Sequence, residues 1–154
     1  MKFLNPLIVV SNIEKSKLFY YEVLGLKVIE DFGANITLTG GIASQTKDSW
    51  STFIHKEDSE IVFGGNESEL YFEEDDFDSF IKRLNNMRDI NYVHSMIEHS
   101  WGQRVVRFYD PDRHIIEVGE NMIKVVRRFL DSGLSIEETA IRMDVPLDYV
   151  KSCL

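Results

Sequence analysis

The 154-residue sequence predicts an α+β fold in which two halves of the chain repeat the same order of secondary structure. Each half begins with a short run of strand-forming residues, at 7–10 and 69–72. An amphipathic helix follows each run, and several strand-like segments follow each helix. Neither half can bury both faces of a small sheet alone. We therefore expect paired modules that form a curved, partly open sheet around a cleft for a small molecule.

The first half covers about residues 1–65. Asn12 suits the N-cap of a helix over 13–24, and Gly25 suits its end, because glycine readily adopts the left-handed conformation found there. The strands expected after this helix cover 27–32, 35–39 and 42–45. The polar stretch 46–51 is predicted to be a loop.

The second half covers about residues 66–120. Acidic residues at 73–76 precede a helix predicted over 77–87, where negative charge complements the helix dipole. The strands expected after it cover 91–94, 105–109 and 114–118. Asp110-Pro111-Asp112 has the residue types of a hairpin turn, so we interpret it as a turn and not as a catalytic pair of aspartates.

Residues 121–154 have a different, helical pattern, with helices predicted over 122–130, after Ser135 and over 147–153. Ser135 and Glu138 form the pattern of a capping box. The order resembles a helix-turn-helix, but a DNA-binding version needs a basic recognition helix. Five Lys and Arg residues here balance five Asp and Glu residues. A packing or dimerising appendage is the favoured interpretation.

Composition limits the classes of partner. The net charge of −9 argues against general attraction to nucleic acid. Cys153 is the only cysteine, so neither an internal disulfide nor a thiolate metal cluster can form. No apolar run approaches the length of about 20 residues that spans a bilayer. We expect a cytoplasmic protein that binds neither nucleic acid nor membrane.

Two stretches carry a resemblance to a known superfamily. The first is residues 7–16 with Phe19-Tyr20 and Val23-Leu24-Gly25, and the second is residues 101–104 with 108–112 and 115–117. Together they resemble the vicinal-oxygen-chelate superfamily of glyoxalase, bleomycin-resistance and extradiol-dioxygenase proteins, over about residues 3–120. The resemblance implies paired βαβββ modules, often assembled as a homodimer.

The resemblance also implies a site for one divalent metal ion. The superfamily's ligand positions fall on Asn5, Gln45, Glu69 and Glu117, of which only Glu117 keeps the usual residue type. Two carboxylates with two amide oxygens suit Mg²⁺, Ca²⁺ or Mn²⁺ better than zinc, nickel or iron. Without a metal, close approach of Glu69 and Glu117 would raise the pKa of one of them, which could then act as a general base.

Four further residues are candidates for substrate binding. Trp101 and Arg104 suit a planar or anionic ligand, although core packing and a surface ion pair are equally open interpretations. His99 is an acid–base candidate because it lies near Trp101 in sequence, whereas the other three histidines are predicted to be solvated. Trp50 could cap the cleft or an interface, and core packing is its alternative.

Three functions follow as hypotheses. The first is a glyoxalase-type lyase or isomerase, in which Glu69 and Glu117 hold a metal and one carboxylate moves a proton. The second is a metal-free protein that binds a small organic molecule, as antibiotic-sequestering relatives do, and it fits the amides at Asn5 and Gln45. The third, a ligand-sensing regulator, is disfavoured by the charge of the tail.

Overall fold

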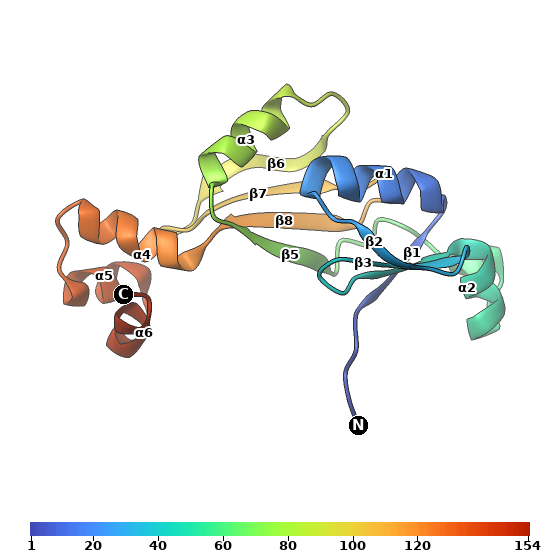
Figure 1. The fold of residues 1–154 in the computed structure, drawn as a ribbon, viewed down its shortest axis with the longest axis horizontal. Helices are drawn as coiled ribbons and strands as arrows, with labels where there is room; N and C mark the ends of the chain where they lie inside the picture. The colour runs from blue at the N-terminus through green and yellow to red at the C-terminus, as the bar shows by residue number, and fades with distance from the viewer. The chain divides into compact units, whose positions relative to one another are not determined.

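A computed structural model describes all residues from 1 to 154 (Figure 1). The chain has eight strands, six α-helices and one short 3₁₀ helix, and its two four-stranded sheets lie in two compact units. The first unit comprises Met1–Glu67 with Asp110–His114, and the second comprises Ser68–Tyr109 with Ile115–Leu154. The predicted α+β class is confirmed. The cleft expected between the halves and the homodimer stay predictions.

The first unit contains one complete βαβββ module. Its sheet has the order β1-β4-β3-β2, with β1 parallel to β4 and the other pairs antiparallel. The 3₁₀ helix Asp58–Glu60 follows the module. The elements of the module, with the helix α2 that follows β4, are β1 (Leu7–Val10), α1 (Ile13–Leu24), β2 (Val28–Asp31), β3 (Asn35–Leu38), β4 (Ala43–Thr46) and α2 (Lys47–Ile54).

Helix α1 begins and ends as its sequence predicts. The Asn12 side chain accepts a hydrogen bond from the Lys15 amide at 3.0 Å, and Gly25 ends the helix with φ of 71°. Tyr20 and Val23 are buried, and so are Ile36 and Leu38 of β3. One face of α1 and one face of the first sheet therefore build the core of this unit.

The loop predicted at 46–51 is wrong, because helix α2 occupies Lys47–Ile54. The Ser49 hydroxyl donates to the Thr46 carbonyl at 3.0 Å, so polar side chains support the first turn. Trp50 is half-buried. Polar composition suggested a loop, but Trp50 and Phe53 are spaced three residues apart, as on one side of a helix.

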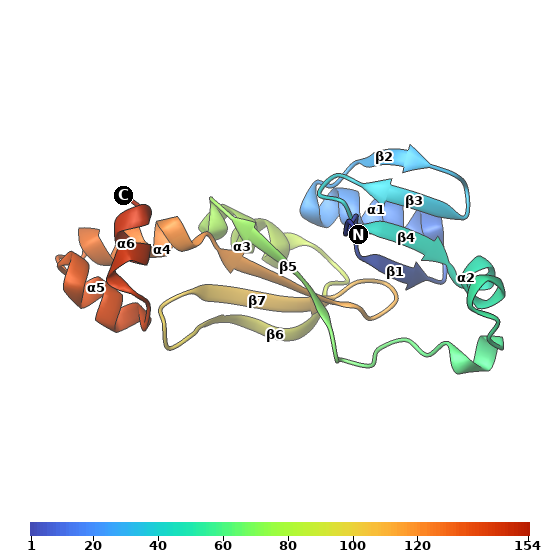
Figure 2. The same ribbon diagram turned by 90° about the horizontal axis from the view of Figure 1, so that it is seen from below.

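The second unit repeats the topology of the first, with the strand order β5-β8-β7-β6 and a parallel β5–β8 pair. The predicted repeat is therefore confirmed (Figure 2). Glu73 and Glu74 belong to the strand, and the helix is capped by Asp76, which accepts from the Ser79 amide. The elements are β5 (Glu69–Glu74), α3 (Phe77–Asn86), β6 (Asn91–Glu98), β7 (Arg104–Tyr109) and β8 (Ile115–Glu120).

Helix α3 covers one face of the second sheet (Figure 1). Arg104 marks this face, because its guanidinium bonds Asp78 of α3 and lies 5.3 Å from the ring centre of Phe77. Alternation along β7 places Val106 and Phe108 on the same face as Arg104, and both are buried. The opposite face of this sheet is called the open face below.

The predicted C-terminal helices are present as α4 (Met122–Asp131), α5 (Ile136–Met143) and α6 (Leu147–Ser152). Ser135 and Glu138 form the predicted capping box. The three helices share a small core that includes Val126, Phe129 and Met143. None of the chain's helices is long and apolar enough to cross a membrane.

The turn between β7 and β8 packs within the first unit. The buried Tyr20 hydroxyl donates to the Asp110 carboxylate at 2.9 Å, and the His114 ring lies 2.8 Å from the same oxygen. Burial and the negative charge of Asp110 raise the pKa of Tyr20 well above its ordinary value. His114 is therefore half-buried and paired, and the prediction that it is solvated is wrong. Asp110 and Asp112 do form a turn, as predicted.

Candidate functional site

The open face of the second sheet gathers charged side chains from neighbouring strands. Residues that pair directly across a sheet point to the same side, and the register pairs Glu117 of β8 with Arg107 of β7 and with Tyr71 of β5. Glu117 lies on the side opposite Ile116 and Val118, which are buried on the α3 side. At this point of β8 the open face therefore carries a charged side chain, whereas its two neighbours on the other face are apolar.

Arg107 is the centre of this group. Its guanidinium forms an ion pair with Glu117 and a second one with Glu69, whose carboxylate lies 2.9 Å from Nε. Glu117 is only 5% exposed, whereas the side chain of Glu69 is 38% exposed. The two carboxylates that the sequence singled out thus lie on one face, joined by one arginine. A buried carboxylate needs such a partner, since an unpaired charge in the interior is costly.

A second group lies beside the charges and joins the loop between β6 and β7 to strand β5. The Trp101 indole donates to the Gln103 side-chain oxygen at 3.3 Å, and the Gln103 amide donates to the Tyr71 hydroxyl at 2.8 Å. Tyr71 in turn donates to Glu73 at 3.0 Å. Gly119 makes room for this chain, because a Cβ atom there would lie 2.7 Å from the Gln103 nitrogen.

His99 and Trp101 form an aromatic stack at the end of this chain. Their rings are 4.2 Å apart between centres and inclined by 18°. Burial, then the positive charge of Arg107 and the nearby His94, lower the pKa of His99 below its ordinary value. His99 is therefore neutral at pH 7 and can accept or donate a hydrogen bond.

Arg104, another predicted site residue, lies on the opposite face of the second sheet. It is on the α3 side of the sheet, where its guanidinium binds Glu120 at 2.9 and 3.0 Å and Asp78 at 2.7 Å. The hydrogen bonds that Arg104 donates to Glu120, opposed by burial, raise the pKa of Arg104. Of the two interpretations of Arg104, the ion pair with acidic neighbours is the one observed.

Three predicted residues belong to the first unit. Asn5 lies in the segment before β1, and Trp50 lies on α2. Gln45 is buried on β4, where its side-chain oxygen accepts from the Asn35 amide at 2.7 Å and its nitrogen bonds the Ser49 hydroxyl. Both polar atoms of the Gln45 amide thus have a hydrogen-bond partner inside its own unit.

Three of the four predicted metal ligands already have other partners within their own units. The Gln45 oxygen already accepts a hydrogen bond, and the positive charge of Arg107 lies at both Glu69 and Glu117. A cation bound to these carboxylates would have to displace a guanidinium of the same charge sign. Neither unit gathers three or more His, Cys, Asp or Glu side chains in a metal-binding group.

Arg107, Tyr71 and Gln103 were missed in the sequence. A usable signal existed for Arg107, because the turn 110–114 fixes the hairpin register that places residue 107 opposite residue 117. No comparable signal exists for Tyr71, since its contact depends on which strands become neighbours in the sheet.

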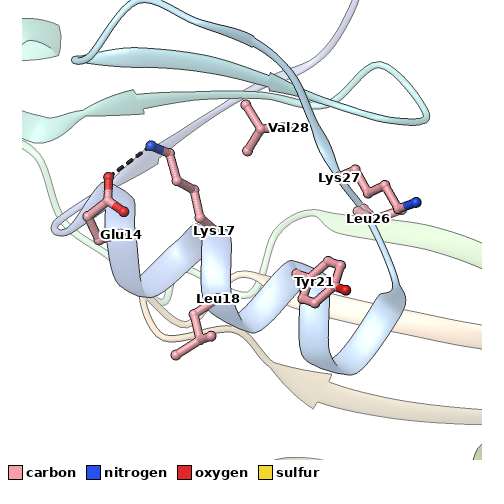
Figure 3. Close-up of a pocket in the computed structure, with 7 residues that line it drawn as sticks. All are labelled: Glu14, Lys17, Leu18, Tyr21, Leu26, Lys27 and Val28. Carbon is pink, nitrogen blue, oxygen red and sulfur yellow. Dashed lines mark hydrogen bonds and ion pairs between the residues drawn. The ribbon is translucent and has the colours of Figure 1, made fainter.

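A groove of about 580 Å³ lies on the first unit between α1 and the start of β2 (Figure 3). Leu18, Tyr21 and Val28 form its apolar part. Lys17 at its edge is paired with Glu14 at 2.8 Å and with Asp31 at 2.7 Å. Lys27, which also lines the groove, balances the second of these two carboxylates, so the groove lacks the excess of charge found on the open face.

The repeated βαβββ topology and the polar open face define a protein of the vicinal-oxygen-chelate class. Residues 3–123 match the model of the family described as glyoxalase-like domain. The chain therefore belongs to the glyoxalase-like domain family.

Solved structures agree with this assignment. A protein of unknown function from Agrobacterium tumefaciens str. C58 is 37% identical, with a TM-score of 0.70 over 79% of this chain and 94% of that chain. A glyoxalase-related enzyme from Fulvimarina pelagi is 15% identical, with a TM-score of 0.66 over 80% of this chain and 91% of that one.

A glyoxalase/bleomycin resistance protein/dioxygenase family enzyme from Burkholderia phytofirmans PsJN is 17% identical, with a TM-score of 0.64 over 76% of this chain and 97% of that one. At this identity the Fulvimarina and Burkholderia structures support the fold alone. No curated protein matches the sequence.

Proposed function

We propose that this protein binds a small organic molecule over the open face of its second sheet, without a divalent metal ion. The observation that carries the proposal is the double ion pair of Arg107 with Glu69 and Glu117. In this arrangement a guanidinium supplies the positive charge that a metal would supply in a metal-dependent relative.

The chemistry of the face suggests the class of ligand. Glu69, Glu73 and Glu117 contribute three carboxylates against the single guanidinium of Arg107, so the face has an excess of negative charge. The indole of Trp101, which is 37% exposed, offers a flat surface beside these charges. A planar aromatic molecule with a positive charge suits both features, through stacking and through charge-assisted hydrogen bonds.

A thermal-shift series tests the proposal. The probes are the planar cation proflavine and the uncharged acridine-9-carboxamide, which has the same ring system. Each probe is tested with and without excess EDTA. We expect proflavine to raise the melting temperature equally in both buffers, since a ligand that binds only the folded state stabilises it by mass action. The neutral analogue should stabilise the protein less.

A variant connects the effect to the open face. Glu73→Gln removes one negative charge from a partly exposed strand residue, and it should weaken proflavine binding several-fold. The matched control is Glu22→Gln on α1 of the first unit, an exposed acid outside the face. Equal weakening in both variants would contradict binding at the open face.

The same buffers test the alternative of a metal-dependent lyase or isomerase. Elemental analysis of protein purified without chelators should find less than about one tenth of an equivalent of Mg, Mn, Ni, Zn or Fe, because Arg107 already pairs with both Glu69 and Glu117. One equivalent of any of these metals, with ligand binding abolished by EDTA, would favour the enzyme and contradict the proposal.

A further inference from the structure

The C-terminal helices meet the loop that carries the aromatic stack. This loop, residues 99–103, joins β6 to β7 and is closed by a hydrogen bond from the Gly102 amide to the His99 carbonyl at 2.8 Å. Gly102 has φ of 89°, a conformation that other residues rarely adopt. The orientation of Trp101 therefore depends on a tight turn with few backbone contacts of its own.

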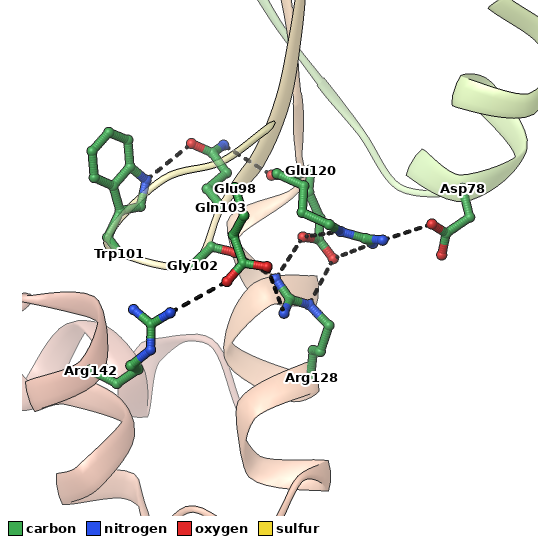
Figure 4. Close-up of polar contacts among 9 residues, drawn as sticks. Asp78, Glu98, Trp101, Gly102, Gln103, Glu120, Arg128 and Arg142 are labelled. Atoms are coloured by element: carbon green, nitrogen blue, oxygen red, sulfur yellow. Dashed lines mark hydrogen bonds and ion pairs between the residues drawn. The ribbon is translucent and has the colours of Figure 1, made fainter. Parts of the chain in front are cut away.

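Two arginines of the C-terminal helices hold the backbone on either side of Trp101. Arg128 of α4 donates to the Gly102 carbonyl, and Arg142 of α5 donates to the Ser100 carbonyl. Arg142 also lies 3.3 Å from a carboxylate oxygen of Glu98 (Figure 4). Both neighbours of Trp101 in the chain are thus fixed by side chains from outside the sheet.

Phe129 completes the contact. A Cβ atom at Gly102 would lie 2.2 Å from the Phe129 ring, so the ring packs directly on the glycine. The guanidinium groups of Arg128 and Arg142 lie 5.1 and 5.0 Å from the centre of the same ring. One aromatic ring therefore holds both arginines and the glycine of the loop together.

Glu120, at the end of β8, joins the C-terminal helices to the sheet. Glu120 is 4% exposed and accepts hydrogen bonds from both Arg104 and Arg128. Burial opposes its ionisation, but the hydrogen bonds and charges of these two arginines prevail and lower the pKa of Glu120. The last turn of α4 is therefore tied to the strand that also carries Glu117.

We infer that helices α4 and α5 orient Trp101 and His99 for ligand binding, with Arg128 and Arg142 as positioning residues. The inference rests on the proposed function of the open face. The family match ends at residue 123, so all three contacting side chains, Arg128, Phe129 and Arg142, come from outside the matched domain. The contacts that hold the loop thus come from a part of the chain that lies outside the matched domain.

The test uses the full-length chain with Trp50→Phe, which leaves Trp101 as the only tryptophan. In this background, Arg142→Ala should increase acrylamide quenching of Trp101 and speed amide exchange in residues 99–103 by about five- to tenfold, the effect of losing one or two hydrogen bonds. Arg142→Lys should restore part of the protection. Arg127→Ala, an exposed arginine on α4, is the matched control.

Proflavine titration then connects the loop to binding. Arg142→Ala should weaken proflavine binding several-fold, whereas Arg127→Ala should leave it unchanged. Loop exchange and quenching in Arg142→Ala equal to those of the control would overturn the inference, as would a mobile loop with unchanged affinity. Failure of the wild-type chain to bind proflavine would instead count against the proposed ligand, and the exchange and quenching data would still decide whether the helices hold the loop. Arg128→Ala repeats the test at the second contact.

Discussion

The two modules place different chemistry on corresponding strands, β4 and β8, of their two sheets. Gln45 lies on β4, the second strand of the first sheet, opposite Val9 and Asn35. Glu117 lies on β8, the second strand of the second sheet, opposite Tyr71 and Arg107. The neutral hydrogen bond from Asn35 to Gln45 thus corresponds to the ion pair between Arg107 and Glu117.

The comparison shows how one topology serves two purposes. In the first module the pair of amides is satisfied internally, since Ser49 bonds the remaining side of Gln45. In the second module the ion pair extends to the partly exposed Glu69 and leaves an excess of negative charge on the face. We therefore propose that the second module recognises the ligand and that the first module serves packing.

The largest expected effect separates the two equivalent pairs. Arg107→Met leaves Glu117 buried without a counter-charge, which should lower the free energy of unfolding by about 3–5 kcal/mol. Asn35→Ala removes only a neutral partner and should cost about 1–3 kcal/mol. Urea denaturation of both variants measures the difference.

The double variant Arg107→Met with Glu117→Met is the control for this prediction. Replacing both members of a buried ion pair by apolar side chains is often neutral, so most of the lost stability should return. Equal losses in Arg107→Met and Asn35→Ala would show that losing the partner of a charged pair costs no more stability than losing the partner of a neutral pair.

A smaller effect is expected at the buried carboxylate of the first unit. Tyr20→Phe removes the hydrogen bond to Asp110, and hydrogen bonds to charged groups contribute about 1.5–3 kcal/mol. Chemical denaturation should show that loss, while proflavine binding at the second sheet stays unchanged. A large loss of binding would contradict the separation of roles.

The pH dependence of the first unit should follow His114. Burial opposes its protonation, but hydrogen bonding and the charges of Asp110 and Asp112 raise its pKa above 6.5. The stabilisation is therefore complete below the unfolded pKa and is lost as the pH rises through the folded pKa. Stability measured from pH 6 upwards should fall, and His114→Gln should flatten that fall. A flat wild-type profile would contradict the pairing with Asp110.

The smallest effect is expected at Glu69. Its side chain is 38% exposed, and exposed ion pairs contribute about 0.2–1 kcal/mol. Glu69→Gln should therefore change stability little but weaken proflavine binding, because it removes charge from the open face. A stability loss as large as that of Arg107→Met would contradict the small contribution expected for an exposed ion pair.

Much of the fold could be predicted from the sequence because its signals are local. The cap at Asn12, the glycine at position 25 and the capping box at Ser135 fix helix ends within a few residues. Helix α2 was missed because its polar side chains outweigh Trp50 and Phe53 in composition. Polar composition alone therefore does not distinguish a short, half-buried helix from a loop.

The site could be predicted only in part. Alternation along β8 was enough to separate Glu117 from Ile116 and Val118. Alternation along β7 likewise places Arg104 and Arg107 on opposite faces of the sheet. Which of these two faces packs against α3 depends on tertiary packing. The contact of Arg142 with Ser100 spans 42 positions, and no local pattern indicates it.

Paramagnetic NMR tests the central claim most directly. Mn²⁺ added to ¹⁵N-labelled protein broadens the amide signals of residues close to any bound ion. If Arg107 takes the place of a metal, the signals of residues 69, 107 and 117 should broaden no more than those of exposed acidic residues such as Glu137. Selective loss of those three signals at one equivalent of Mn²⁺ would contradict the account.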